Sequence, residues 1–72
     1  MAVPAPISVL VDARGLRCPW PVLRLARAAR GLEAGVIELL SDDPAAAGEV
    51  ASFVAERGWR LEAGQGRFVV IL

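Results

Sequence analysis

The stretch Ile7-Ser-Val-Leu-Val-Asp-Ala-Arg-Gly-Leu-Arg-Cys-Pro-Trp-Pro-Val-Leu23 predicts a strand, a loop and the start of a helix in direct succession. Residues 7–11 are apolar and largely β-branched without a helical period, which is typical of a strand. In the loop over residues 12–17, Gly15 is free to adopt a positive φ angle. The two prolines are tolerated in the first helical turn, where an N–H would be unpaired anyway. We therefore expect a β–loop–α unit with Cys18 at its turning point.

The rest of the chain continues these signals and predicts the order βαβαββ. After a first helix that ends near residue 30, we expect a strand at 36–40, a second helix at 44–57, and strands at 59–62 and 67–72. Asp43 directly precedes Pro44 and is interpreted as the N-cap of the second helix rather than as a catalytic acid. Right-handed crossovers place both helices on one face of the sheet. We predict an α/β two-layer sandwich in one domain over residues 7–72, after a flexible tail at residues 1–6.

The composition disfavours several classes of function. The chain has one cysteine, no histidine and no lysine, so it lacks an internal disulfide, a Cys/His zinc cluster, a Cys–His nucleophile pair and a Schiff-base lysine. Eight arginines balance eight acidic residues, which disfavours direct nucleic-acid binding. No apolar run approaches the roughly 18 residues of a membrane span. We expect no metal and no cofactor, and a cytoplasmic location, because an unpaired cysteine without a secretory signal suits a reducing compartment.

Cys18 is the candidate reactive residue because it follows the first strand, and chemistry in open sheets collects at the carboxyl ends of parallel strands. The helix start and nearby Arg14 and Arg17 predict a lowered thiol pKa and a larger thiolate fraction. Asp12 is expected to pair with one of these arginines. A buried structural cysteine is the alternative, but a Gly/Arg/Pro loop argues against burial. With no base or resolving thiol nearby in sequence, the remaining chemistry is to accept an atom from a partner and pass it on.

Apolar residues at helical spacing predict which face of each helix meets the sheet. They are Val22, Leu25, Ala29 and Leu32 in the first helix and Ala46, Val50, Phe53 and Val54 in the second. The opposite side of the first helix carries Trp20, Leu23, Arg24, Arg27 and Arg30. This outer face is interpreted as a docking patch for an acidic partner. The competing interpretation is a solvated arginine face with Trp20 folded back over the loop.

The segment at residues 12–23 resembles the TusA/SirA-like sulfur carrier family, whose signature is C-P-x-P preceded by D-x-R-G-L-x. Asp43-Pro44 resembles the Asp-Pro entry to the family's second helix. The resemblance implies a mixed four-stranded sheet of order 1-2-4-3, a helix start shaped by Pro19 and Pro21, and a persulfide on Cys18. Trp20 departs from the Met or Glu that members often carry.

The resemblance also implies partners. A cysteine desulfurase or a rhodanese would donate the sulfur, and a relay protein would accept it for tRNA thiolation, molybdenum cofactor assembly or sulfur oxidation. Such a chain would be a sulfurtransferase-type carrier rather than an independent catalyst. We expect a monomer that forms transient complexes.

Two other functions stay open on the residues alone. A regulatory protein-interaction module would use the C-P-x-P turn and the arginine face of the first helix without sulfur transfer. A redox sensor would be oxidised at Cys18 to a sulfenic acid or an intermolecular disulfide.

Overall fold

A computed structural model describes residues 9–72 of the chain. The predicted tail at 1–6 and the first two residues of the predicted first strand lie outside the described residues. The described elements are β1 Val9–Asp12, α1 Trp20–Ala29, β2 Val36–Leu40, α2 Ala46–Arg57, β3 Arg60–Ala63 and β4 Arg67–Ile71. The predicted order βαβαββ is therefore confirmed.

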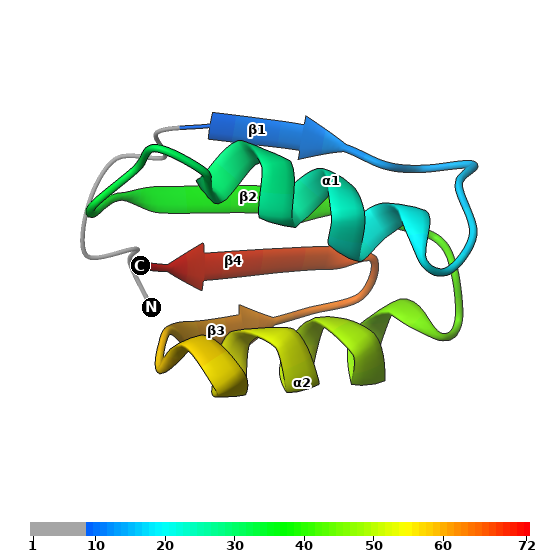
Figure 1. Ribbon diagram of the computed structural model, residues 1–72. Coiled ribbons are helices and arrows are strands. Elements are labelled where there is room, and N and C mark those ends of the chain that lie inside the picture. Colours follow the sequence, from blue (N-terminus) through cyan, green and yellow to red (C-terminus); the bar gives the residue numbers. More distant parts are fainter. Residues whose placement is uncertain (1–8) are drawn as a thin grey trace.

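The four strands form one mixed sheet with the order β1-β2-β4-β3. β1 pairs parallel with β2, whereas β4 runs antiparallel to both β2 and β3. Both helices lie on the same face of this sheet, with α1 over β1 and β2 and α2 towards β3 (Figure 1). The predicted two-layer sandwich and its strand order are confirmed.

The core lies between the sheet and the two helices. Strand residues that point towards the helices are buried, among them Ile37, Leu39, Phe68 and Val70. Leu25, Ala29, Ala46, Val50 and Val54 meet them from the helices. Val22, Leu32 and Phe53 are partly buried at the margin of this cluster. The helical stripes predicted from the sequence are thus the faces that pack on the sheet, except that Leu32 reaches the core from beyond the end of α1.

The second helix begins later than the sequence predicts. Pro44 and Ala45 form a turn, and α2 starts at Ala46. The reason is local, because Asp43 satisfies the first N–H groups itself. Its side chain accepts the N–H of Ala45 at 3.1 Å and its carbonyl accepts that of Ala46 at 3.0 Å. At the other end, Gly58 stops the helix with a left-handed φ of 73°.

Three connections meet at one edge of the molecule, the right-hand edge in Figure 1: the β1–α1 loop, the β2–α2 loop and the β3–β4 turn. The backbone N–H of Ser41 donates to the carbonyl of Gly66 at 3.0 Å, which joins two of them. A Cβ at Gly66 would lie 3.2 Å from the carbonyl oxygen of Ser41, and its φ is +67°. Both facts favour glycine there, so the turn can pack against the loop that precedes α2.

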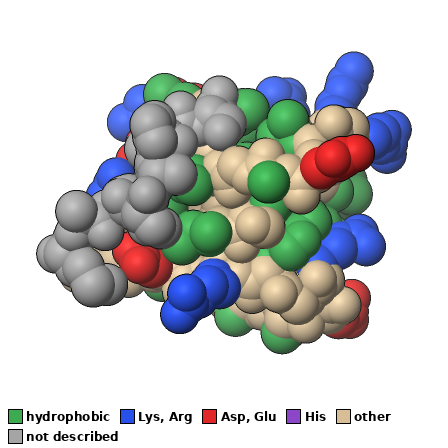
Figure 2. Space-filling model, turned by 90° about the vertical axis from the view of Figure 1, so that its left-hand side faces the viewer, with side chains coloured by type: hydrophobic (Ala, Val, Ile, Leu, Met, Phe, Trp, Pro, Cys, Tyr) green, Lys and Arg blue, Asp and Glu red, His purple; other side chains and the backbone are tan. Residues whose placement is uncertain are grey.

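The opposite edge faces the viewer in Figure 2, where basic side chains project around hydrophobic ones. Near the end of α2, the rings of Phe53 and Trp59 meet edge to face at 5.8 Å. The guanidinium of Arg57 lies 4.5 Å from the centre of the Phe53 ring. This aromatic group covers the core beside the end of α2, whereas Cys18 lies near the start of that helix.

No helix within residues 9–72 is both long and apolar enough to cross a membrane.

Leu25 supplies a first test of the packing, because it is fully buried in the middle of α1. We expect Leu25→Ala to lower the free energy of unfolding by about 2–5 kcal/mol, since the change leaves a cavity. Leu23→Ala is the matched control on the same helix, where the side chain is 48% exposed, and should change it by less than about 1 kcal/mol. Urea denaturation measures both. Equal losses in the two variants would contradict the assigned faces of α1.

Candidate functional site

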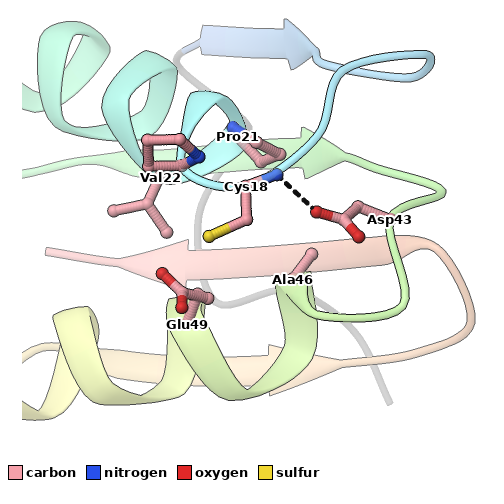
Figure 3. A pocket seen from close by; sticks show the side chains of 7 residues that line it. Cys18, Pro21, Val22, Asp43, Ala46 and Glu49 are labelled. Carbon is pink, nitrogen blue, oxygen red and sulfur yellow. Dashed lines mark hydrogen bonds between the residues drawn. The ribbon is translucent and has the colours of Figure 1, made fainter.

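Cys18 is a free, exposed cysteine in the β1–α1 loop, two residues before α1 begins. Its peptide bond to Pro19 is cis. The sulfur points into a shallow hollow between α1 and α2, towards Glu49 (Figure 3). The residues that line this hollow are Cys18, Pro19, Pro21, Val22, Asp43, Ala46 and Glu49. The prediction that Cys18 is accessible rather than a buried structural residue is confirmed.

Two neighbouring aspartates hold the cysteine loop from the β2–α2 loop. The backbone N–H of Gly15 donates to Oδ1 of Asp42 at 3.0 Å. The N–H of Cys18 donates to Oδ2 of Asp43 at 2.6 Å, the bond drawn in Figure 3. Hydrogen bonds to a charged acceptor are shorter and stronger than neutral ones. Contacts across 25 and 27 residues of sequence therefore fix the backbone on both sides of Arg17.

Asp43 is itself held in place by its own loop. Its N–H donates to the hydroxyl oxygen of buried Ser41 at 3.2 Å. Its Oδ1 accepts the N–H of Ala45 while Oδ2 accepts that of Cys18. Ala45 occupies the N-cap position of α2, so the prediction that Asp43 is the N-cap is wrong; Asp43 instead caps the turn that leads into the helix. It also positions the cysteine, a second role that the capping signal does not reveal.

The environment of the thiol raises its pKa, so the prediction of a lowered pKa is wrong. Although the residue is exposed as a whole, its sulfur is partly desolvated against apolar neighbours, and this is the main reason that the pKa of Cys18 rises. A hydrogen bond with Glu49 and the negative charges of Glu49 and Asp43 raise the pKa further. The thiol therefore lies in an acidic setting that favours its neutral form.

The expected sources of positive charge are engaged elsewhere or missing. Arg14 pairs with Asp12 through its backbone N–H and its guanidinium, at 2.8–3.1 Å. These hydrogen bonds with Arg14 lower the pKa of the Asp12 carboxyl to about 2, and they raise that of Arg14. Both side chains are more than half exposed, so the pair adds little stability. Of the predicted partners for Asp12, Arg14 is the one observed.

The start of α1 also offers the sulfur few N–H groups. Pro19 and Pro21 have no N–H, and the N–H of Trp20 donates to the carbonyl of Arg17 at 2.8 Å. The positive end of the helix dipole is carried by such free N–H groups. The prolines that shape the helix start therefore also weaken the effect that was expected to ionise the thiol.

The other supporting residues lie around the cysteine in different ways. Gly15 has a φ of +86°, the positive value expected for the loop. Pro21 is buried, whereas Pro19 is exposed beside the sulfur. The side chain of Arg17 lines a separate hollow with Gly15, Leu16, Asp42, Asp43 and Pro44. Arg14 and Arg17 are therefore not brought together around the thiol.

The outer face of α1 is exposed next to this site. Trp20 and Leu23 are 55% and 48% exposed, which is high for large apolar side chains. Arg24 and Arg27 are exposed on the same helix. Trp20 thus has the accessibility that a docking patch needs. The role of these four residues in binding stays a prediction.

Glu49 is a site residue that sequence reasoning missed. It comes from α2, and its carboxylate points towards the sulfur of Cys18 (Figure 3). Ala46 lies one turn before it on the same helix and lines the same hollow. The inward position predicted for Ala46 was the available signal, because residues three apart share a helix face. Within residues 9–72, no three His, Cys, Asp or Glu side chains are grouped so that they could hold a metal ion.

Comparisons with known proteins connect this site to a family. The family profile described as "Sulfurtransferase TusA" matches residues 9–72. A protein of Archaeoglobus fulgidus named as a candidate sulfur carrier is 43% identical, over 83% of this chain and 87% of the relative. A second such protein of that organism is 37% identical, over 74% of each chain. The crystal structure of a SirA-like protein from Desulfitobacterium hafniense superimposes with a TM-score of 0.69 at 26% identity, covering 88% of this chain and 92% of the other.

The role of the hydrogen bond between Asp43 and Cys18 can be tested by amide hydrogen exchange at Cys18. We expect Asp43→Ala to lower the free energy of unfolding by about 1–2 kcal/mol, because it removes a cap and a charged acceptor. Asp42→Ala, the matched control, removes one exposed acceptor and should cost less. Amide hydrogen exchange should accelerate at Cys18 in Asp43→Ala and at Gly15 in Asp42→Ala. Unchanged exchange at Cys18 in Asp43→Ala would contradict the positioning role.

Proposed function

The chain belongs to the TusA family, and from this premise we propose that it carries sulfane sulfur as a persulfide on Cys18. The observation that carries the proposal is the exposed Cys18, whose backbone N–H is held by Asp43, inside the segment that the family profile matches. The two relatives named as candidate sulfur carriers support the same chemistry. Persulfide exchange needs an approachable sulfur and a partner thiol.

The shape of the site favours a partner protein over a small-molecule substrate. The hollow beside the sulfur is narrow, and the side chains that line it leave no enclosed volume. Among the described residues, those that line this hollow thus leave no room for a substrate molecule beside the sulfur. An exposed sulfur at the edge of the domain is instead placed for contact with the surface of another protein, where a sulfur atom can pass between two cysteines.

The proposed loading step is an exchange without net oxidation. The Cys18 thiolate attacks the outer sulfur of a donor persulfide, and the new S–S bond forms as that of the donor breaks. The donor cysteine leaves as a thiolate and takes the proton that Cys18 lost. Unloading reverses these roles, because an acceptor thiolate then attacks the outer sulfur on Cys18.

A cysteine desulfurase or a rhodanese is the donor that we propose, with a sulfur-relay protein as acceptor. The outer face of α1, formed by Trp20, Leu23, Arg24 and Arg27, is the surface that we assign to docking. It joins two exposed apolar side chains to two basic ones beside Cys18. Such a composition suits a partner with an acidic rim around an apolar contact.

Intact-protein mass spectrometry tests the carrier function. After incubation with a cysteine desulfurase and cysteine without reductant, we expect the chain to gain the mass of one sulfur atom, which reductant then removes. Cys18→Ser should gain nothing, because its hydroxyl forms no persulfide. If wild type gains nothing from this donor or from a rhodanese with thiosulfate, the carrier proposal is wrong and an interaction module becomes the better explanation.

The docking assignment is tested by charge reversal on α1. We expect Arg27→Glu to slow sulfur loading several-fold at low ionic strength, and added salt to reduce the difference. Arg60→Glu is the matched control, since Arg60 is exposed on β3 and away from α1. Loading rates come from a time course of the same mass measurement. Equal slowing in both variants would point to overall charge rather than to this face.

A further inference from the structure

Two carboxylates close the hollow around the sulfur, and Glu49 is the one whose position the sulfur carrier function does not yet explain. Glu49 projects from the first turn of α2, and its carboxylate faces Sγ of Cys18 (Figure 3). Asp43 is occupied by the N–H groups of Cys18 and Ala45. Glu49 is therefore the carboxylate placed to interact with the sulfur itself.

No basic side chain among residues 9–72 lines this hollow. The groups that face the sulfur from α1 are Pro21 and Val22, which do not ionise, and those from α2 and its preceding loop are Ala46, Glu49 and Asp43. Arg17 lines a different hollow, and Arg14 is paired with Asp12. Among the described residues, the ionisable neighbours in the hollow are thus both acidic, and negative charge on the sulfur is disfavoured from two sides.

We propose that Glu49 is a positioning residue that keeps the sulfur carried on Cys18 in its protonated form and thereby favours its release. This inference rests on the proposed carrier function. A persulfide is a stronger acid than the thiol from which it forms, so it ionises nearer to neutral pH. A neighbouring carboxylate therefore changes the protonation of the loaded state most. The neutral persulfide is also the better electrophile for an attacking thiolate.

The release step balances in atoms and charge. The acceptor thiolate attacks the outer sulfur of Cys18–S–SH, a new S–S bond forms, and the old one breaks. The proton of the persulfide moves to the departing sulfur of Cys18, which leaves a neutral thiol on Cys18 and a persulfide anion on the acceptor. Glu49 assists at the end of this step, because the re-formed thiol hydrogen bonds with its carboxylate.

The test is the pH dependence of alkylation by iodoacetamide, a neutral reagent that reacts with ionised sulfur. Because Cys18 is the only cysteine, the signal is unambiguous. We expect Glu49→Gln to move the midpoint towards lower pH for the unloaded thiol and for the loaded persulfide. Glu49→Asp should keep a midpoint near that of wild type, since it retains the charge. Glu56→Gln, an exposed site two turns along α2, should not move it.

Release is measured on loaded protein by transfer of sulfur to 2-mercaptoethanol near neutral pH. We expect Glu49→Gln to release sulfur several-fold more slowly than wild type and Glu56→Gln to match wild type. An unchanged or raised midpoint in Glu49→Gln, or faster release from it, overturns the proposal. Failure of wild type to accept sulfur would instead sink the carrier function, and the alkylation profile of the unloaded thiol would still report whether Glu49 acts on Cys18.

Discussion

The site depends on hydrogen bonds between two loops that are distant in sequence. Asp42 and Asp43 accept the backbone N–H groups of Gly15 and Cys18, so the end of β2 fixes the chain that leaves β1. These strands are parallel neighbours, and their carboxyl ends bring the two loops together. Ser41 then ties the same loop to Gly66 of the β3–β4 turn. The sheet is thus the frame on which one sulfur atom is held.

This arrangement places the sulfur in an acidic setting rather than a basic one. Desolvation of the sulfur opposes its ionisation most, and the carboxylates that hold and face Cys18 add to this effect. The prolines also reduce the N–H groups that would favour ionisation. A protein that only receives sulfur would gain from a stable thiolate. A protein that must also give it away gains from a sulfur that prefers to be neutral. The electrostatics of the hollow are therefore consistent with a carrier whose loaded state is temporary.

The elements of the fold could be predicted from local signals in the chain. The apolar runs, the prolines at or just before the start of each helix, and Gly58 indicate where most elements begin and end to within one or two residues. The central place of β4 came from the family resemblance, because strand order depends on pairing that no local pattern encodes. The roles of Asp42 and Glu49 stayed hidden for a similar reason. Each acts on a residue more than twenty positions away. The direction of the Cys18 pKa shift depends on burial of the sulfur and on Glu49 and Asp43, which are likewise distant in sequence.

The cysteine loop contributes only backbone N–H groups to the bonds that anchor it, and the side chains come from the opposite loop. A backbone N–H is present in almost any residue. The side chains of Arg17 and Trp20, both exposed, consequently take no part in these bonds, whereas Leu16 packs against the core. The two exposed side chains can therefore be replaced without loss of the hydrogen bonds that position Cys18. The residues that hold Cys18 in place are thus different from the exposed side chains that shape the surface around it.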